Sequence, residues 1–403
     1  MSARSRRTSI RRSRCRPDGA GCMDTPLCRL LGVGFPLVAF SHCRDVVASV
    51  CHAGGFGVFG AASYTPEELE TELCWIDAHT DGRPYGVDLL IPENLAVRTG
   101  TGANSGDLAA QIPEAHRAFA HDLLRRYGVD PTRPLRNYRR EDPDRPPPYQ
   151  IDTGERLMDV AFRHPIRLIA NALGVPPRSM LERARQYGIP CAALVGAREH
   201  AVRQVEAGVD IIVAQGTEAG GHCGEVSTMV LIPEVLRAIR GIGDVPVLAA
   251  GGIMTGRQMA ACMAMGAAGA WTGSVWLATV EAETSPVFRE RMVAARSRDT
   301  TRSRGRTGKP ARQLRSAWTD GWDGPDSPGA LPMPLQGLLS EPAMARVNRS
   351  AEAGNDQARE LVSYFVGQGV GLVESVTSCR TVVEMFMTEF AEALEDMQRF
   401  AAG

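Results

Sequence analysis

The sequence predicts an α/β protein whose eight parallel strands close into a (β/α)8 TIM barrel, with a smaller accessory helical segment after the eighth strand. From residue 35 onward, short apolar runs alternate with segments of helical period, and glycines recur where helices give way to strands. Eight apolar runs are present, the number of strands that closes such a barrel. The expected strands span residues 35–40, 56–60, 85–90, 167–173, 189–194, 210–215, 245–250 and 268–273.

The segments between these strands have the period of amphipathic helices. Helices are expected at residues 65–79, 177–187, 197–207, 229–240 and 256–265. Gly188, Gly208 and Gly266 close three of them, as is typical of a helix that stops before a strand. Because each helix leads into the next strand in this way, the sheet is expected to be parallel.

The first 22 residues differ in composition from the rest of the chain. They contain seven arginines and a single acid, Asp18. This composition resembles a transit peptide, but no apolar stripe accompanies the arginines. We therefore interpret residues 1–22 as a disordered tail, or as an upstream start before a chain that begins at Met23.

The remaining chain divides into three parts. Residues 23–285 are expected to form the barrel, interrupted by a polar, Pro-rich surface insertion at about 92–155. Residues 286–365 are expected to form the accessory segment, an assignment implied by a family resemblance that motifs elsewhere in the chain carry. The amphipathic end of the chain, 366–403, is expected to return to the barrel as a closing helix.

Composition excludes several classes of protein. A net charge of −1, with 23% charged residues, argues against nucleic acid as the main partner. No run of about 18 apolar residues is present, so we expect no membrane span. Ten scattered cysteines without C-x-x-C spacing indicate reduced thiols in a cytoplasmic protein. No metal site is expected, because adjacent His-Cys pairs on a strand point to opposite faces.

Small residues follow the last three strands of the expected barrel. The sequence A-Q-G-T-E-A-G-G-H-C, residues 214–223, ends the sixth strand. Gly251-Gly252 ends the seventh strand and Gly273-Ser274 the eighth. Glycine lets backbone N–H groups approach a ligand, and these strand ends often bind a phosphate. They predict a phosphate-bearing cofactor; tight packing of helix on strand is the other reason for such glycines.

His222, in the loop after the sixth strand, is the candidate catalytic base. Histidine titrates near neutral pH, which suits proton transfer. His42, also at a strand end, competes for this role, and a loop histidine can simply face solvent. Glu218 and Glu225 could orient the His222 ring or face water. Gln215 offers both a donor and an acceptor to the polar edge of a heterocycle.

Three motifs in order carry a family resemblance: A-Q-G-T-E-A-G-G-H-C-G, V-L-A-A-G-G-I-x-T-G-R and W-T-G-S-x-W-L-A-T. They closely resemble the nitronate monooxygenases, formerly called 2-nitropropane dioxygenases, over residues 26–90 and 160–400. The resemblance implies an FMN-containing TIM barrel in which His222 is the catalytic base. It assigns FMN binding to Gln215, Gly220, Gly221, Gly251, Gly252, Gly273 and Ser274.

Two strand ends depart from the family pattern. The first strand of the family usually ends in Q-G-G-M, where this chain has Ala39, Phe40, Ser41 and His42. The third strand usually ends in G-V-N, where this chain has Asp88. We assign Ala39, Phe40, Ser41 and Asp88 to the cofactor site by position. An ionised Asp88 could accept hydrogen bonds there but could not donate one.

The expected function is the FMN-dependent oxidation of alkyl nitronates or nitroalkanes with O2, giving a carbonyl product and nitrite. A first alternative is an NAD(P)H-dependent FMN reductase resembling the FMN-containing enoyl-acyl-carrier-protein reductase, which shares the Gly-Gly-His turn. A second is a flavin-binding protein without turnover. The expected partners are thus small molecules, with no nucleic acid or membrane.

Overall fold

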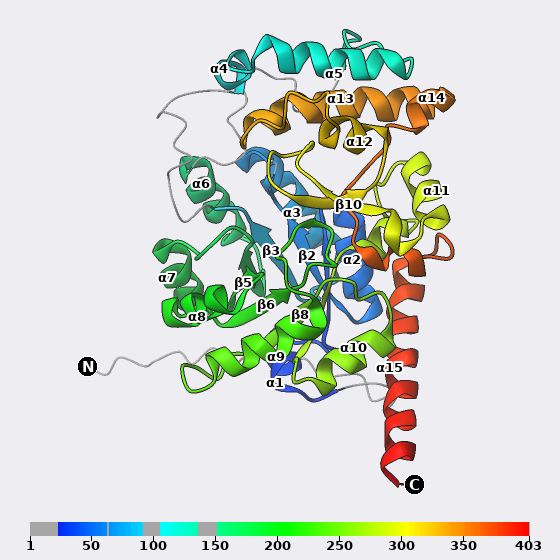
Figure 1. Ribbon diagram of the computed structural model, residues 1–403. Coiled ribbons are helices and arrows are strands. Elements are labelled where there is room, and N and C mark those ends of the chain that lie inside the picture. The colour runs from blue at the N-terminus through cyan, green and yellow to red at the C-terminus, as the bar shows by residue number, and fades with distance from the viewer. Residues whose placement is uncertain (1–22, 63, 92–104, 136–150, 403) are drawn as a thin grey trace, which may run out of the picture.

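The computed structural model describes residues 23–62, 64–91, 105–135 and 151–402. Eight parallel strands form a closed barrel in the order β1-β2-β3-β4-β5-β6-β8-β9, which confirms the predicted fold class (Figure 1). Each expected strand is present, with ends that differ by two residues at most. The strands are β1 (Leu37–Ser41), β2 (Phe56–Gly60), β3 (Tyr85–Leu89), β4 (Leu168–Asn171), β5 (Cys191–Val195), β6 (Ile211–Gln215), β8 (Val247–Ala250) and β9 (Gly269–Thr272).

Helices surround the barrel, and their ends follow the local sequence. In α3, Thr65 accepts a hydrogen bond from the Glu68 N–H, and Glu68 accepts one from the Thr65 N–H. Gly188 and Gly208 close α7 and α8 with φ of +66° and +88°, a conformation that favours glycine. Leu27 and Leu31 of α1 (Pro26–Leu31) join the cluster inside the barrel. The outer helices are α2 (Arg44–Ala53), α3 (Pro66–His79), α6 (Ile151–Ala161), α7 (Arg178–Tyr187), α8 (Arg198–Ala207), α9 (Thr228–Ile239) and α10 (Gly256–Ala264).

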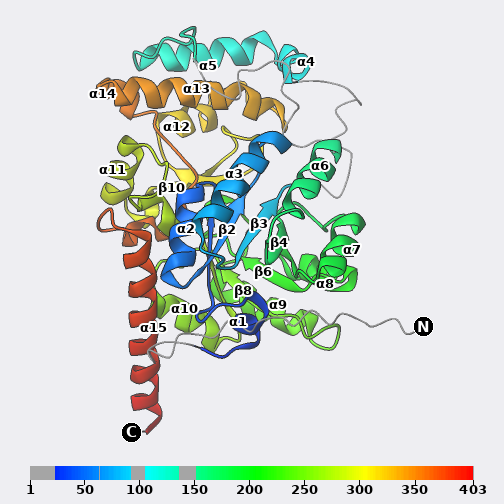
Figure 2. The ribbon, with the colours of Figure 1, turned by 180° about the vertical axis from the view of Figure 1, so that it is seen from behind.

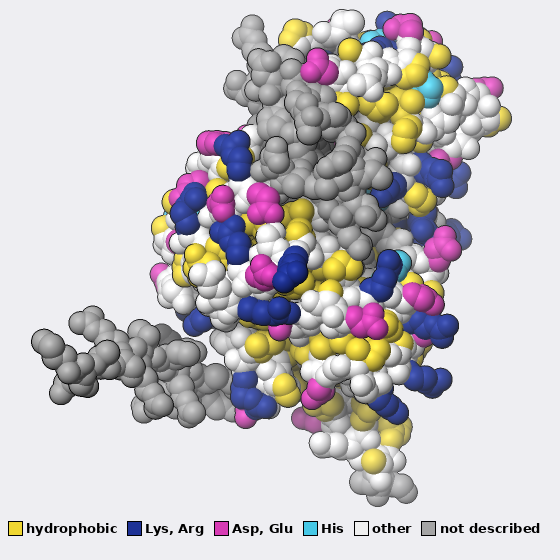
Figure 3. Space-filling model, turned by 90° about the vertical axis from the view of Figure 1, so that its left-hand side faces the viewer, with side chains coloured by type: hydrophobic (Ala, Val, Ile, Leu, Met, Phe, Trp, Pro, Cys, Tyr) yellow, Lys and Arg dark blue, Asp and Glu magenta, His cyan; other side chains and the backbone are white. Residues whose placement is uncertain are grey.

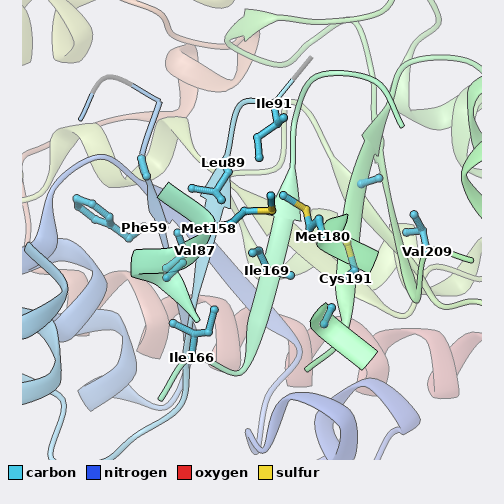
Figure 4. Close-up of a cluster of buried hydrophobic side chains, with 14 of the residues drawn as sticks. Phe59, Val87, Leu89, Ile91, Met158, Ile166, Ile169, Met180, Cys191 and Val209 are labelled. Atoms are coloured by element: carbon cyan, nitrogen blue, oxygen red, sulfur yellow. The ribbon is translucent and has the colours of Figure 1, made fainter. Parts of the chain in front are cut away.

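Alternate residues of each strand enter two separate cores. Side chains such as Val38, Val58 and Val213 fill the barrel interior. The residues between these inward-facing positions face outward. On β3 and β4, for example, Val87 and Ile169 pack against side chains of α6 and α7 (Figure 4). The direction of a strand residue is therefore fixed by its parity.

A layer of helices covers one end of the barrel, and two distant parts of the chain build it (Figure 1). One buried cluster combines Leu123 and Leu124 of the insertion with Trp318 and Val347 of the segment after β9. The described part of the insertion, residues 105–135, therefore packs into this cap. The cap helices are α4 (Ser105–Ala110), α5 (Glu114–Arg126), α11 (Pro286–Ala294), α12 (Ala317–Asp323), α13 (Leu335–Glu352) and α14 (Asp356–Arg359).

The last helix, α15 (Cys379–Ala402), runs along the side of the barrel and packs on α10 and α2 (Figure 2). Phe386 and Phe390 are buried there, and Phe390 meets Phe35 edge to face with centroids 5.6 Å apart. A Cβ at Gly256 would lie 2.1 Å from the Phe386 carbonyl oxygen, so glycine permits this close helix crossing.

The surface carries charges of both signs. On the face in Figure 3, Lys and Arg side chains are interspersed with Asp and Glu. This distribution fits the net charge of −1. Within the described residues, no helix is both long and apolar enough to cross a bilayer.

Candidate active site

The Gly-rich loop after β6 is part of a second sheet. Gly221 and His222 form strand β7, which pairs antiparallel with β11 (Ala311–Leu314), and β10 (Thr300–Ser303) completes the sheet. The Arg312 side chain reaches back to the loop and donates to the Thr217 carbonyl oxygen over 2.8 Å. The sequence indicated a turn here; in the structure, His222 is fixed to the cap.

The His222 ring is oriented by Thr307. His222 Nε2 lies 2.8 Å from Thr307 Oγ1, and that hydroxyl lies 3.1 Å from the Lys309 carbonyl oxygen. One hydroxyl proton cannot serve both contacts. When it is donated to the carbonyl oxygen, Nε2 must carry the ring proton, and Nδ1 is left as the basic atom. Thr307 thus takes the orienting role that the sequence considered for Glu218 and Glu225.

The pKa of His222 lies below its ordinary value. Surrounding protein atoms displace part of the water around the ring, and the Lys309 ammonium nearby adds like charge. The ring still reaches solvent. At neutral pH His222 is therefore uncharged and able to accept a proton.

A glycine strap, residues 366–371, ties the β6 loop to the end of β9. The Gly367 N–H donates to Ser274 Oγ over 2.8 Å, and the Gln368 N–H donates to the Glu218 carbonyl oxygen over 2.8 Å. A Cβ at Gly220 would lie 2.8 Å from the Val366 carbonyl carbon, so Gly220 makes room for the strap. The strap joins the two strand ends that the sequence assigned to the site.

Sequence analysis missed this strap. The signal was the alternation G-Q-G-V-G at residues 367–371, which we assigned only to the start of a closing helix. A Cβ at Gly367 would lie 2.5 Å from the Glu218 carbonyl oxygen, and one at Gly369 would lie 2.3 Å from Met254 Cγ. Alternating glycines therefore let this stretch pass close to the barrel loops.

The turn after β8 requires both of its glycines. Gly251 and Gly252 have φ of +105° and +73°, and a Cβ at Gly251 would lie 2.9 Å from Thr228 Oγ1. The Glu218 carboxylate braces the turn, because it accepts from both the N–H and the hydroxyl of Thr228 over 2.9 Å. Glu218 therefore fixes the start of α9 instead of touching His222.

Three backbone N–H groups are free where the last two strands end. Among the residues that the structure describes, no protein acceptor is found for the N–H of Gly251, Gly252 or Gly273. A Cβ at Gly273 would have no neighbour within 4 Å, and likewise at Gly221. Tight packing therefore explains Gly251 and Gly220, and a φ of +73° explains Gly221, but no protein contact explains Gly273.

Three predicted site residues share the inward face at the carboxyl ends of the barrel strands. Phe40 packs on the interior cluster and stacks on Trp271 with centroids 6.3 Å apart. Asp88 and Gln215 point inward by parity, since their neighbours Val87 and Ala214 belong to the outer core. Strand parity thus directs all three side chains into the barrel interior, although they are far apart in sequence.

Two other assignments point elsewhere. Ala39 packs its side chain in the outer core beneath α2 and α10, so that only its backbone can face the site. Ser41 Oγ accepts from the Cys43 N–H over 3.1 Å at the start of α2. Of Ala39, Phe40 and Ser41, which were assigned to the cofactor site by position, Phe40 is the one whose side chain packs in the barrel interior.

His42 also lies at the barrel mouth. Its Nδ1 is 2.7 Å from the Gly60 carbonyl oxygen, and its ring meets Phe40 edge to face. Since a carbonyl can only accept, Nδ1 carries the proton, and Nε2 is the basic atom. A Cβ at Gly60 would lie 2.7 Å from the His42 ring, so position 60 must be glycine to leave room for this ring.

Asp88 is not the ionised carboxylate that the sequence suggested. Its side chain is buried, and Oδ1 has no hydrogen-bond partner among the described residues. Burial alone raises the pKa of Asp88 to about 8. At neutral pH the group is mostly protonated and can donate a hydrogen bond.

Asp88→Asn is expected to flatten the pH dependence of stability in the flavin-free protein. The native carboxyl keeps its proton up to pH about 8, whereas the unfolded chain releases it near 3.8. Between these values the native state binds more protons, so the free energy of unfolding falls as pH rises, by at most about 1.4 kcal/mol per pH unit. Asparagine has no such proton, so the variant loses this slope.

Urea unfolding at a series of pH values measures the effect. Asp122→Asn is the control, because Asp122 is exposed and pairs with Arg125 on α5. Equal slopes in wild type and Asp88→Asn would show that Asp88 is ionised in the native protein.

Comparisons with known proteins show the family to which this chain belongs. Residues 36–389 match the sequence model of nitronate monooxygenase. The chain belongs to the nitronate monooxygenase family. This family membership makes it a flavin-dependent oxidoreductase.

Several relatives are similar over most of the chain. A Mycobacterium tuberculosis protein, provisionally named a monooxygenase, is 52% identical over 93% of this chain and 99% of its own length. A "Probable nitronate monooxygenase" of Staphylococcus saprophyticus is 27% identical over 88% of this chain and 95% of its own.

Among solved structures, the nitroalkane oxidase of Streptomyces ansochromogenes has a TM-score of 0.72 and 27% identity, covering 93% of this chain and all of that one (100%). FabK of Thermotoga maritima has a TM-score of 0.66 at 24% identity, covering 94% of this chain and 99% of its own, and shares the fold.

Proposed function

We propose that this family member is an FMN-dependent nitronate monooxygenase that oxidises an alkyl nitronate or nitroalkane with O2 to a carbonyl product and nitrite. One observation carries the proposal. The strap, residues 366–371, joins the β6 loop that carries the uncharged His222 to the end of β9. The free backbone N–H groups of Gly251, Gly252 and Gly273 lie at the ends of β8 and β9. Family membership and the similarity to a nitroalkane oxidase support it.

The residues present fit an FMN molecule. The free N–H groups of Gly251, Gly252 and Gly273 would hold its phosphate, since backbone N–H groups at strand ends favour anions. The Glu218 carboxylate lies near this turn, and its Oε2 accepts hydrogen bonds from the N–H and hydroxyl of Thr228. Asp88, whose Oδ1 has no partner among the described residues, and Gln215 would meet polar atoms of the ring system from the barrel interior.

In this proposal, the protein supplies proton transfer and positioning. Bound FMN would accept electrons from the nitronate and deliver them to O2. His222 Nδ1 would remove the α-proton of a neutral nitroalkane, and Thr307 would hold the ring for that transfer. The Lys309 ammonium near His222 would stabilise the nitronate anion so formed.

Absorption spectra of the purified protein test the proposal. A yellow protein whose flavin spectrum changes on anaerobic addition of propionate 3-nitronate, and which then forms nitrite with O2, is expected. Rapid bleaching by NADH, with no response to the nitronate, would instead indicate the flavin reductase. A yellow protein inert to both would indicate a binding protein, and a colourless one that takes up no FMN would contradict the cofactor.

A further inference from the structure

A second cluster of chemically active side chains lies outside the barrel, between α3 and the end of α6. Glu70 and Cys74 are four residues apart on α3 and therefore share a face. His164 follows α6, which packs beside α3 (Figure 2). One ligand atom from each of these three residues lies within 4.8 Å of the other two.

His164 is the unusual member of this cluster. Its side chain is only 6% exposed, and its Nδ1 lies 2.7 Å from Asp77 Oδ2. Its Nε2 is buried and has no hydrogen-bond partner among the residues that the structure describes; the Glu70 carboxylate is 3.6 Å away. Tyr85 donates a 2.6 Å hydrogen bond to the other oxygen of Asp77 and holds that carboxylate in place.

The contacts of His164 determine which of its ring nitrogens can bind an ion. Asp77 accepts the Nδ1 proton, which leaves the Nε2 lone pair facing the Glu70 carboxylate and the Cys74 sulfur. The Cys74 thiol donates to Glu70 Oε1 over 3.8 Å, so the carboxylate carries the negative charge that faces this lone pair. A proton on Nε2 would balance that charge, and so would a metal ion that replaces the thiol proton.

We propose that Glu70, Cys74 and His164 bind a divalent transition metal ion of the zinc type. Imidazole nitrogen, thiolate sulfur and carboxylate oxygen are the ligands that zinc takes, and water would complete a tetrahedral site. The Asp77–His164 pair matches the carboxylate that usually orients a metal-binding histidine. Arg163 pairs with Glu70 Oε2, which leaves Oε1 for the ion.

The cluster is both rigid and reachable. Leu73 and Ile76 of α3 and Met158 of α6 are fully buried in one core, so both ligand-bearing segments are held in place. Glu70 is 40% exposed and Cys74 is exposed, so an ion can enter from solvent. Binding would release the Cys74 thiol proton to water and pin the end of α6 to α3.

Cobalt is the probe for this site, because Co2+ replaces Zn2+ and its thiolate complexes absorb visibly. Chelator-treated full-length protein is expected to bind one Co2+ with a thiolate-to-cobalt absorption band, which Zn2+ then displaces. Cys74→Ser should abolish the band, and His164→Gln should weaken binding by about tenfold or more. Zn2+ should raise the Tm of the wild type but not of Cys74→Ser.

Glu67→Gln is the matched control. Glu67 lies on the same helix, pairs with Arg156 and is exposed, so its variant should bind Co2+ like the wild type. Circular dichroism checks that Cys74→Ser is folded. An unchanged band in Cys74→Ser would overturn the proposal by placing the ion on another cysteine. Failure to take up Co2+, with both His164 ring nitrogens protonated by NMR, would overturn it in favour of an imidazolium between two carboxylates.

Discussion

Turnover of a neutral nitroalkane is expected to fall by about a hundredfold or more in His222→Asn, with the flavin still bound. His222 is the proposed base and is oriented by Thr307, whereas the free N–H groups proposed for the phosphate belong to the β8 and β9 ends. Asparagine keeps a polar side chain on β7 but cannot accept a proton at neutral pH. Steady-state kinetics and the flavin content of the purified variant measure the two parts of this prediction.

The choice of substrate separates proton removal from other roles of His222. A preformed nitronate has already lost its α-proton, so the variant should be impaired much less with a nitronate than with the nitroalkane. Equal losses on both substrates would show that His222 does not act as the base. Near-normal turnover of the nitroalkane would remove His222 from the mechanism, and His42 would become the candidate.

The pH profile provides an independent check on the same residue. Since the pKa of His222 is lowered, kcat/KM for the nitroalkane should fall on the acid side only below pH 6.5, the ordinary pKa of histidine. Lys309→Gln removes the nearby ammonium and should move that fall to higher pH. Burial is the larger cause, so the fall should move only part of the way.

The fold was predictable because its signals are local. Each strand end and each helix stop is encoded within a few residues, as with Gly188 and Gly208, whose positive φ values mark helix ends. The union of the insertion with the cap was not predictable in this way. It depends on Leu123 meeting Trp318 and Val347, residues about two hundred positions further along the chain.

The candidate site likewise has features that the local sequence predicts and features that depend on distant contacts. Glycines after three strands and a single loop histidine were readable, because residue type and position carry the signal. Strand β7 was not, since it exists only by pairing with Ala311 and Arg312. The proton on Asp88 was also hidden, because its pKa depends on burial, which sequence alone does not reveal.

Gly273→Ala is expected to weaken flavin binding by about tenfold or more and to lower stability only through its backbone conformation. Gly273 has φ of −128° and ψ of −59°, outside the main regions for residues with a Cβ, but its Cβ would have no protein atom within 4 Å. The substitution therefore leaves the protein's own packing unchanged. A methyl group there would crowd a phosphate approaching the free Gly273 N–H, and a lost charge-assisted hydrogen bond is worth about 1.5–3 kcal/mol.

Thermal unfolding of the flavin-free protein and FMN titration separate the two effects. Gly337→Ala is the control, because Gly337 on α13 also has an open Cβ position but lies in the cap. Gly251→Ala would be a poor test, since its φ of +105° and its contact with Thr228 predict misfolding as well as flavin loss. If Gly273→Ala binds FMN like the wild type, the phosphate does not lie at the end of β9, because no protein contact gives Gly273 another reason to be glycine.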